Sequence, residues 1–343
     1  MLFDGISIAG NEVKAKSFIE RVRGKRFRFV CVISYTKTCE IPGLTVAGVN
    51  SELLQHTPAA DAEFLYHGEC KCINSIPATP DGKPTPALLT RAALKTAEIP
   101  LVVVDAGSKI KPNIPHVTLE LTNGENIAEG HALNIDMVKK AFGNGLKLGI
   151  KLGENMECVV IGESIPAGTT TALGVLLTMG IDAKFKVSSS MPENPHELKL
   201  STVEHGMKSV AIPFGYLANK PFESISYMGD PMIPSVAAIA IGASKKSNVM
   251  LAGGTQMAAV LCIINAIDKN ALENIVVGTT KYILHDKSSD ICQLIKSIAD
   301  VPILSCDPYL ERSKKEGLRA YANGFVKEGV GAGGACIAAN LKS

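Results

Sequence analysis

The sequence predicts an α/β protein with a doubly wound, mostly parallel sheet of the Rossmann-like three-layer type and a smaller subdomain built from the chain ends. Short apolar runs rich in β-branched residues recur along the chain, and stretches with helical periodicity separate them. This pattern is typical of parallel strands joined by crossover helices. Of the 343 residues, 46% are hydrophobic but only 5% are aromatic. A core of Val, Ile, Leu and Ala indicates strands that helices cover on both faces.

Seven apolar runs are the predicted strands: residues 27–33, 101–105, 158–161, 210–213, 249–252, 275–279 and 301–304. Five segments between them are the predicted helices: residues 134–152, 169–179, 233–244, 257–266 and 290–298. Asn134 suits an N-cap because its side chain can accept a hydrogen bond from the first helical turn. Gly180 suits the position directly after a helix, because glycine tolerates the left-handed backbone conformation that is common there.

Proline-rich, serine-rich and charged segments indicate how the chain is divided. Residues 76–86 are predicted to be a loop or linker, and residues 188–195 an exposed loop that forms an active-site wall. Residues 311–319 are charged and precede a glycine-rich tail. We therefore expect an α/β nucleotide-binding domain over residues 61–310. A smaller subdomain, made of residues 1–60 and 311–343, would carry a glycine loop that contains a glutamate.

The charge balance favours a small-molecule ligand. The 35 basic and 33 acidic residues nearly cancel, so no overall field attracts nucleic acid or a membrane surface. Nine cysteines without regular spacing suit a reducing compartment better than a disulfide framework. No N-terminal segment resembles a signal peptide, and no apolar run reaches membrane-spanning length. We expect a cytoplasmic protein with small-molecule substrates and no nucleic-acid or membrane partner.

The most informative stretch is a glycine loop between a predicted strand and a predicted helix. The loop runs from Gly162 to Gly168, and Thr169 and Thr170 then open the helix. A tight loop that leads into a helix directs free backbone N–H groups and the positive end of the helix dipole at one point, where a phosphate fits. Glu163 would repel a phosphate there unless it serves another part of the same ligand. A nucleotide whose ribose faces Glu163 satisfies both groups.

A second glycine-rich element, residues 328–335 (EGVGAGGA), has two explanations. Only nine residues follow Gly334, which is too few for the βαβ unit of a dinucleotide fingerprint. The glycines fit a helix that starts in close contact with a neighbouring element. They also fit a functional loop, because Glu328 is a second carboxylate at the mouth of a glycine loop. Two such acids suit a general base and a charge-stabilising partner.

Other polar motifs give weaker signals. Asp105 ends a predicted strand, and as a lone acid it suits a cap on the strand end at least as well as a magnesium–pyrophosphate site. The loop that begins at Gly162 lacks the lysine of a Walker P-loop, so NTP hydrolysis is disfavoured. Cys70 and Cys72 lack a second pair at zinc spacing, so no metal site is predicted. Lys199 is by default a solvated lysine, although its place after residues 188–195 would let it reach an anion.

Taken together, these motifs resemble the nicotinate-nucleotide–dimethylbenzimidazole phosphoribosyltransferase family over residues 88–339, and more closely an archaeal branch related to that enzyme. Five stretches occur in the family's order. The two glycine loops are similar to family motifs: Gly162-Glu163…Gly168-Thr169-Thr170 is similar to GExGxGNTT, and residues 327–332 are similar to GEGTGA. Residues 104–107 are similar to VDVG, residues 126–133 are similar to N(F/I)xEGPAM, and residues 198–204 are similar to a segment with a phosphate-contacting lysine. Gly168 stands where the family usually has asparagine. Pro166, which replaces a family residue in the loop, has no N–H to donate.

The resemblance implies a function and a set of site residues. The reaction would move the phosphoribosyl group of nicotinate mononucleotide to a benzimidazole-type base, as in the synthesis of the cobalamin lower ligand. Glu328 would be the general base, and Glu163 would stabilise positive charge on the ribose. The implied nucleotide-binding residues are Gly162, Ser164, Ala167, Gly168, Thr169, Thr170, Lys199, Gly329 and Gly331. The resemblance also implies a homodimer, no metal, and no cofactor besides the substrate nicotinate mononucleotide.

Two other functions stay open at this point. One is a nucleosidase or a phosphoribosyltransferase with a different acceptor, such as a phenol or a purine, because the loop is altered and residues 1–60 match no family motif. The other is a non-catalytic nucleotide-binding or sensory protein that kept the fold. The two acids speak against the second, since a phosphate binder gains nothing from them.

Overall fold

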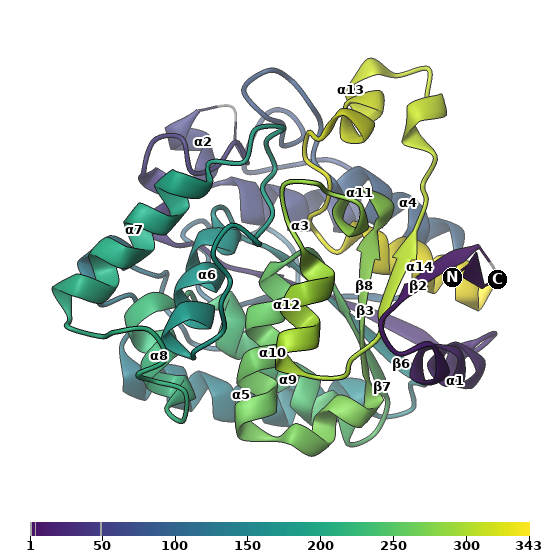
Figure 1. Ribbon diagram of the computed structural model, residues 1–343. Helices are drawn as coiled ribbons and strands as arrows, with labels where there is room; N and C mark the ends of the chain where they lie inside the picture. The colour runs from purple at the N-terminus through teal and green to yellow at the C-terminus, as the bar shows by residue number, and fades with distance from the viewer. Residues whose placement is uncertain (1, 4, 49) are drawn as a thin grey trace.

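The computed structural model describes residues 2–3, 5–48 and 50–343 and contains one sheet with helices on both faces (Figure 1). The strand order is β1-β2-β9-β8-β7-β6-β3-β4-β5. All neighbouring pairs from β9 to β5 are parallel, whereas β2 runs antiparallel to both β1 and β9. The predicted fold class, a doubly wound and mostly parallel sheet, is therefore confirmed.

Six of the seven predicted strands are strands of this sheet, with ends shifted by up to three residues. The strands are β1 Leu2–Phe3, β2 Ile6–Ala9, β3 Phe27–Ile33, β4 Leu101–Asp105, β5 Val117–Thr118, β6 Cys158–Ser164, β7 Asn248–Ala252, β8 Ile275–Thr280 and β9 Ile303–Cys306. The prediction of a strand at residues 210–213 is wrong. These residues form the turn after helix α7 (His196–Ser209), where Ile212 N–H donates to the Met207 carbonyl at 2.9 Å. Ile212 is buried against the helix end, which explains the short apolar run.

Two helical layers cover the sheet, and all five predicted helices are present. The first layer contains α5 Ile135–Gly153, α6 Gly168–Thr178, α7, α8 Pro221–Met228, α9 Met232–Ser244, α10 Gln256–Ile267 and α12 Ile291–Ile298. The second contains α1 Glu12–Val22, α3 Thr57–His67, α4 Ala87–Thr96 and α14 Ala332–Lys342. Short helices complete the chain: α2 Ser51–Leu54, α11 Lys281–Leu284, α13 Glu316–Arg319, and the 3-10 turns Lys37–Glu40, Ile127–Glu129, Lys269–Asn274, Leu310–Arg312 and Ala320–Asn323. Asn134 caps α5 as predicted, and Gly180 has the left-handed φ of +87°.

Side chains along β6 point alternately to the two helical layers. Val159 and Ile161 lie in the core beneath α5, α6, α9 and α10, whereas Cys158 and Val160 lie in the core beneath α1, α3, α4 and α14. Successive side chains of a strand point to opposite faces. The last two residues of β6, Glu163 and Ser164, therefore point to different helical layers.

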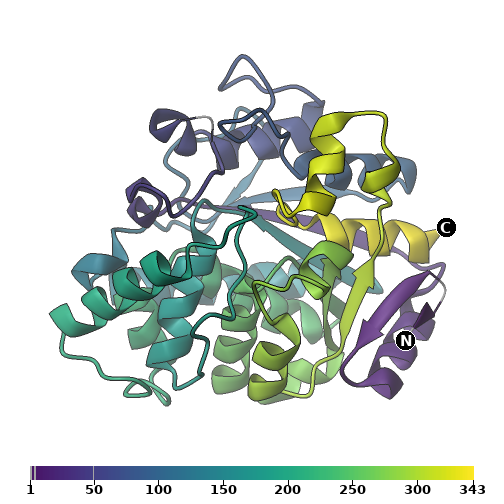
Figure 2. The same cartoon turned by 45° about the horizontal axis from the view of Figure 1, so that its top comes forward.

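The two chain ends lie side by side: β1 and β2 are strands of the main sheet, and α14 packs on this sheet (Figure 2). This arrangement differs from the expected division into residues 61–310 and a subdomain of residues 1–60 with 311–343. Strands β2 and β3 both belong to the one sheet, and α14 packs across β7, β8 and β9. A separate small core forms around Leu310, Tyr321 and Val326. None of the described helices has both the length and the apolar composition to span a bilayer.

Helices α5 and α9 pack closely because glycines face the contact. A Cβ atom added at Gly149 of α5 would lie 2.2 Å from the Ile239 carbonyl oxygen of α9. One added at Gly242 of α9 would lie 2.3 Å from the Leu146 carbonyl oxygen of α5. Both contacts are with backbone atoms, so the helices would have to separate to admit a methyl group.

Gly149→Ala is therefore expected to lower the free energy of unfolding by about 1–3 kcal/mol, the usual cost of forcing a methyl group into a packed core. Gly143→Ala is the matched control in the same helix, because a Cβ atom there meets nothing within 4 Å. That substitution should raise stability by up to about 1 kcal/mol through helix propensity. Urea unfolding of both variants tests the pair, and equal effects would contradict the packing explanation.

Candidate active site

A pocket opens at the carboxyl edge of the sheet, where the direction of winding changes. After β3 the chain adds β4 and β5 on one side, and after β6 it adds β7, β8 and β9 on the other. Loops leaving β3 and β6 thus diverge and leave a crevice, the usual ligand position in such sheets. The cavity volume is about 140 Å³, and the empty space including open solvent at the mouth is about 920 Å³. Its walls include residues 44–47, 77–79, 83–86, 163–169, 188–190 and 328–330.

Glu163 lies at the centre of this wall. It is 2% exposed, and the side-chain amide of Gln256, the first residue of α10, donates a hydrogen bond to its Oε1. Burial raises the pKa of Glu163 to about 8, and the negative charges of Asp230, Glu328 and Asp61 act in the same direction, whereas the Gln256 hydrogen bond opposes them. In this environment Glu163 is therefore largely protonated at neutral pH.

Glu328 lines the same pocket from the loop that precedes α14. Its carboxylate accepts backbone N–H bonds from Thr280 at 2.9 Å, Gly329 at 3.1 Å and Gly333 at 3.1 Å. Burial raises the pKa of Glu328 to about 7, although these three hydrogen bonds favour the charged form. A carboxylate that titrates near neutrality matches the requirement for a general base.

The loop around Glu328 is held in an unusual backbone conformation. Val326, Lys327 and Val330 have φ values of +62°, +52° and +52°, which is rare for residues other than glycine and least favourable for β-branched ones. Val330 N–H donates to the Glu163 carbonyl at 3.0 Å, and the Thr90 hydroxyl donates to the Val330 carbonyl at 2.9 Å. These contacts fix Glu328 relative to Glu163 from both neighbouring elements.

The glycines at this junction provide close packing. A Cβ atom added at Gly162 would lie 2.9 Å from the Gly331 Cα, and one added at Gly331 would lie 2.9 Å from the Gly162 Cα. Neither residue lines the pocket, so the prediction that both touch the nucleotide is not reflected in the geometry. Both explanations of residues 328–335 hold together: the glycines let α14 approach the sheet, and Glu328 reaches the pocket.

The predicted phosphate loop is shorter than expected, because β6 continues through Glu163 to Ser164. Ala167, with φ +62° and no side-chain cap, leads directly into α6. Ser164, Ala167, Gly168 and Thr169 line the pocket, together with Gly329 of the second loop. Thr170 is buried and does not line it, and its hydroxyl has no hydrogen-bond partner among the described residues.

Lys199 is neither solvated nor in the pocket wall, so its default assignment to the surface is wrong. It is 0% exposed, and its ammonium group donates to the Ser188 carbonyl at 2.6 Å and to Asn194 Oδ1 at 2.9 Å. Burial lowers the pKa of Lys199 to about 7, and the charge of Lys327 adds to this. Lys199 therefore supports the loop of residues 188–195 from behind. Ser188 and Ser189 of that loop are buried rather than exposed, yet they line the pocket as an active-site wall should.

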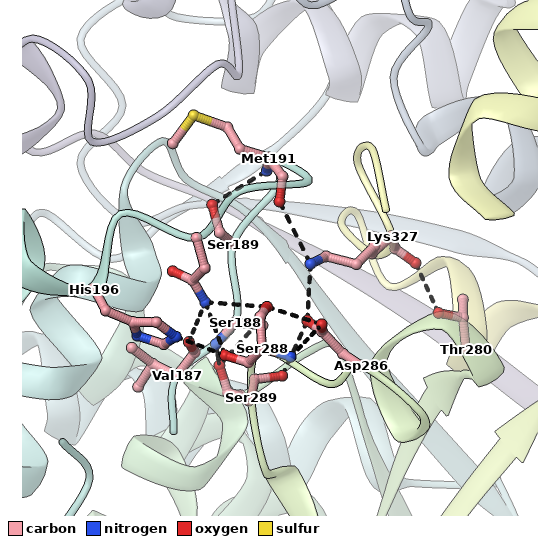
Figure 3. A network of polar contacts seen from close by, with 12 residues as sticks. Val187, Ser188, Ser189, Met191, His196, Thr280, Asp286, Ser288, Ser289 and Lys327 are labelled. Carbon is pink, nitrogen blue, oxygen red and sulfur yellow. Dashed lines mark hydrogen bonds and ion pairs between the residues drawn. The ribbon is translucent and has the colours of Figure 1, made fainter. Parts of the chain in front are cut away.

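A buried polar network joins this loop to the Glu328 loop (Figure 3). Lys327 forms an ion pair of 2.8 Å with Asp286, and the Thr280 hydroxyl donates to the Lys327 carbonyl at 2.7 Å. Burial opposes ionisation of Asp286, but Lys327 and hydrogen bonds from Ser288 outweigh it, so the pKa of Asp286 lies below its ordinary value. The Glu328 loop is thus tied to the carboxyl end of β8, and both walls of the pocket are tied to the segment that follows α11.

Sequence reasoning missed three polar residues at this site: Asp61, Asp230 and Gln256. Asp61 lines the pocket from α3, where Asp61 and Glu63 stand among Ala, Phe and Leu in the sequence, and this was the available signal. Asp230 caps α9 through N–H bonds from Met232 at 2.8 Å and Ile233 at 3.1 Å. The pKa of each aspartate is raised to about 6, mainly by burial.

The other motifs lie outside the pocket. Asp105 accepts N–H bonds from Gly107 at 3.0 Å and Ser108 at 2.8 Å and pairs with Lys111 at 2.6 Å, which is the capping arrangement. The Cys70 thiol donates to the Ala60 carbonyl at 3.3 Å. Within the described part of the chain, no three His, Cys, Asp or Glu side chains are grouped as a metal site requires.

Comparisons with known proteins agree with this architecture. Residues 90–282, which are 193 of the 343 residues, match the family model described as Phosphoribosyltransferase. A UPF0284 protein of Archaeoglobus fulgidus is 48% identical over 92% of this chain and 88% of its own length. One from Methanothermobacter thermautotrophicus is 42% identical over 99% of this chain and 94% of its own length.

Solved structures show the same fold at low sequence identity. The nicotinate-nucleotide-dimethylbenzimidazole phosphoribosyltransferase of Thermus thermophilus superposes with a TM-score of 0.60 at 14% identity, covering 97% of this chain and 91% of that one. A structure of CobT from the same organism gives 0.61 at 13% identity, covering 95% of this chain and 89% of that one.

The raised pKa of Glu163 leads to a prediction about stability. Its pKa of about 8 in the folded protein exceeds the ordinary value of 4.5, so between these values the folded state holds a proton that the unfolded state has lost. The free energy of unfolding should therefore fall as pH rises from about 5 to 8, by an amount on the order of 2–4 kcal/mol.

Glu163→Gln should flatten this pH dependence, because glutamine does not titrate and can still accept the Gln256 hydrogen bond. Glu20→Gln, an exposed change on α1, is the control and should leave the slope unaltered. Urea unfolding at several pH values measures it. An unchanged slope in Glu163→Gln would show that this carboxyl is ionised in the folded protein.

Proposed function

Because the chain belongs to the phosphoribosyltransferase family and to the UPF0284 proteins of archaea, we propose that it moves the phosphoribosyl group of nicotinate mononucleotide to a benzimidazole-type base, the step that makes the cobalamin lower-ligand nucleotide. The observation that carries this proposal is the meeting of Glu163, Glu328 and the N-terminus of α6 at one pocket. In the proposal Glu163 faces the ribose, Glu328 is the base for the acceptor, and the N-terminus of α6 is the anion site for the phosphate.

In this proposal the donor lies along the wall formed by β6 and α6. The free N–H groups of Gly168 and Thr169 receive the 5′-phosphate, aided by the helix dipole. The sugar then faces Glu163. The pyridinium ring of nicotinate mononucleotide carries a positive charge, and a positive charge beside a carboxyl favours its ionised form. Donor binding would thus remove the proton that Glu163 otherwise holds at neutral pH.

The chemical step forms one carbon–nitrogen bond and breaks another. A ring nitrogen of the acceptor attacks the anomeric carbon, and the bond to nicotinate breaks with its electron pair passing to the pyridine nitrogen. Positive charge that develops on the ribose is stabilised by the Glu163 carboxylate. Glu328 takes the proton from the acceptor's N–H group, which leaves a neutral azole on the sugar.

Glu328→Gln should lower turnover by about two orders of magnitude or more while nicotinate mononucleotide binds with nearly unchanged affinity. Glutamine keeps an oxygen for the N–H groups that hold the side chain but cannot take a proton at neutral pH. Chromatography of the nucleotide product measures turnover, and calorimetry measures donor affinity.

Glu316→Gln is the matched control, because this exposed glutamate lies near the same chain end and outside the pocket wall. Turnover of Glu328→Gln at the level of this control would remove Glu328 from the chemistry. Product analysis with benzimidazole, purine and phenol acceptors, and with water alone, separates the proposed transfer from another acceptor or a nucleosidase. Donor binding without turnover of any acceptor would instead indicate a nucleotide-binding protein.

A further inference from the structure

One part of the pocket wall is formed by residues 44–47, by α3 and by the loop that precedes α4. We call this part of the pocket the α3 lobe; its apolar residues are Leu44, Val46, Ala47, Pro77, Ala78 and Pro84. Proline and small aliphatic side chains offer flat, non-polar surfaces, which suit the faces of a planar ring. The polar residues of the same wall are Thr45, Thr57, Thr79, Lys83, Thr85 and Asp61.

Strand alternation places the α3 lobe on the opposite side of β6 from the proposed sugar site. Glu163 points to the α10 layer, where Gln256 contacts it, whereas Ser164 points to the α3 layer, where its hydroxyl contacts Asp61. Glu328 comes from the loop that precedes α14, and its carboxylate accepts the Thr280 N–H bond at the end of β8. The proposed proton acceptor and Asp61 line the same pocket.

Asp61 is a buried acid in the wall of the α3 lobe. It is 3% exposed and lines the pocket. Its Oδ1 accepts from the Thr85 hydroxyl and its Oδ2 from the Ser164 hydroxyl, each at 2.7 Å. A carboxylate has room for about four hydrogen bonds, so each oxygen keeps a free acceptor position. Among the ion pairs between described residues, none includes Asp61.

A structural link between Thr85 and Ser164 does not require an acid. A neutral side chain such as asparagine could join two hydroxyl groups, whereas burial of a carboxylate without a cation is unfavourable. A buried acceptor with free positions in a pocket wall is a usual means by which a pocket selects a ligand with a donor at that point.

We propose that the α3 lobe holds the acceptor base and that Asp61 accepts a hydrogen bond from an exocyclic amino or hydroxyl group on it. The preferred acceptor is then a planar nitrogen heterocycle that carries such a donor, in place of a benzimidazole substituted only with methyl groups. This inference rests on the proposed function and adds a specificity residue to it, while Glu328 remains the acceptor of the ring N–H proton.

The test compares two bases of nearly equal size, 5-aminobenzimidazole and 5-methylbenzimidazole, by calorimetric binding to the wild-type protein. A hydrogen bond to a charged group contributes about 1.5–3 kcal/mol, so the amino compound should bind at least about tenfold tighter. Asp61→Asn should reduce that ratio by about fivefold or more, because a neutral amide accepts a weaker hydrogen bond. Asp136→Asn, an exposed change on α5 in the opposite layer, should keep the wild-type ratio.

The wild-type comparison needs no variant, so it decides the matter even if Asp61→Asn does not fold. Equal affinities of the wild-type protein for the two bases would overturn the inference. An Asp61→Asn protein that loses affinity for both bases alike, with the ratio kept, would also overturn it, since that is the result of a purely structural link.

Turnover of both bases with nicotinate mononucleotide, measured in parallel, separates the two proposals. Nucleotide formation with equal kcat/KM for the two bases would leave the proposed function standing and overturn the role of Asp61. Selective, Asp61-dependent binding without any nucleotide product would support the base site and overturn the proposed transfer.

Discussion

The close contact between β6 and the start of α14 is the constraint on which the site depends. Gly162 and Gly331 meet with no room for a Cβ atom on either side, and the adjacent Val330 N–H bonds to the Glu163 carbonyl. Because of this contact, a residue near the end of the chain reaches a strand in its middle. Any larger residue at the junction would push α14 away from the sheet and take Glu328 out of the pocket.

The same junction gathers four carboxyl groups in a small, buried space. Asp61, Glu163 and Glu328 line one pocket, and Asp230 lies behind Glu163. Their pKa values are all raised, with burial as the main cause. Such a cluster is unfavourable by itself and becomes favourable when a cation enters it. The pyridinium ring of the proposed donor supplies that cation, and the ring loses its positive charge when nicotinate leaves, which would weaken binding after transfer.

The sequence patterns predict the features that depend on neighbours along the chain and miss those that depend on distant partners. Apolar runs locate six strands, and two glycine loops locate Glu163 and Glu328. Residues 210–213 show the limit, because a short apolar run serves a buried helix end as well as a strand. Ser164 looks like part of a phosphate loop, yet its hydroxyl contacts Asp61, 103 residues earlier in the chain. Local sequence also does not show that strand β2 pairs with β9, from nearly the other end of the chain. The homodimer and the cytoplasmic location stay predictions.

Two consecutive residues of β6 therefore serve two different substrates in the proposed reaction. A strand sends Glu163 to one face of the sheet and Ser164 to the other, so the donor and the acceptor approach the same strand end from opposite layers. The anomeric carbon and the attacking nitrogen then meet at the sheet edge, where neither helical layer intervenes. A binding protein for a single nucleotide needs only the Glu163 side. The part of the pocket on the Ser164 side, with Asp61 in its wall, is the part that the proposed transfer requires and a phosphate binder does not.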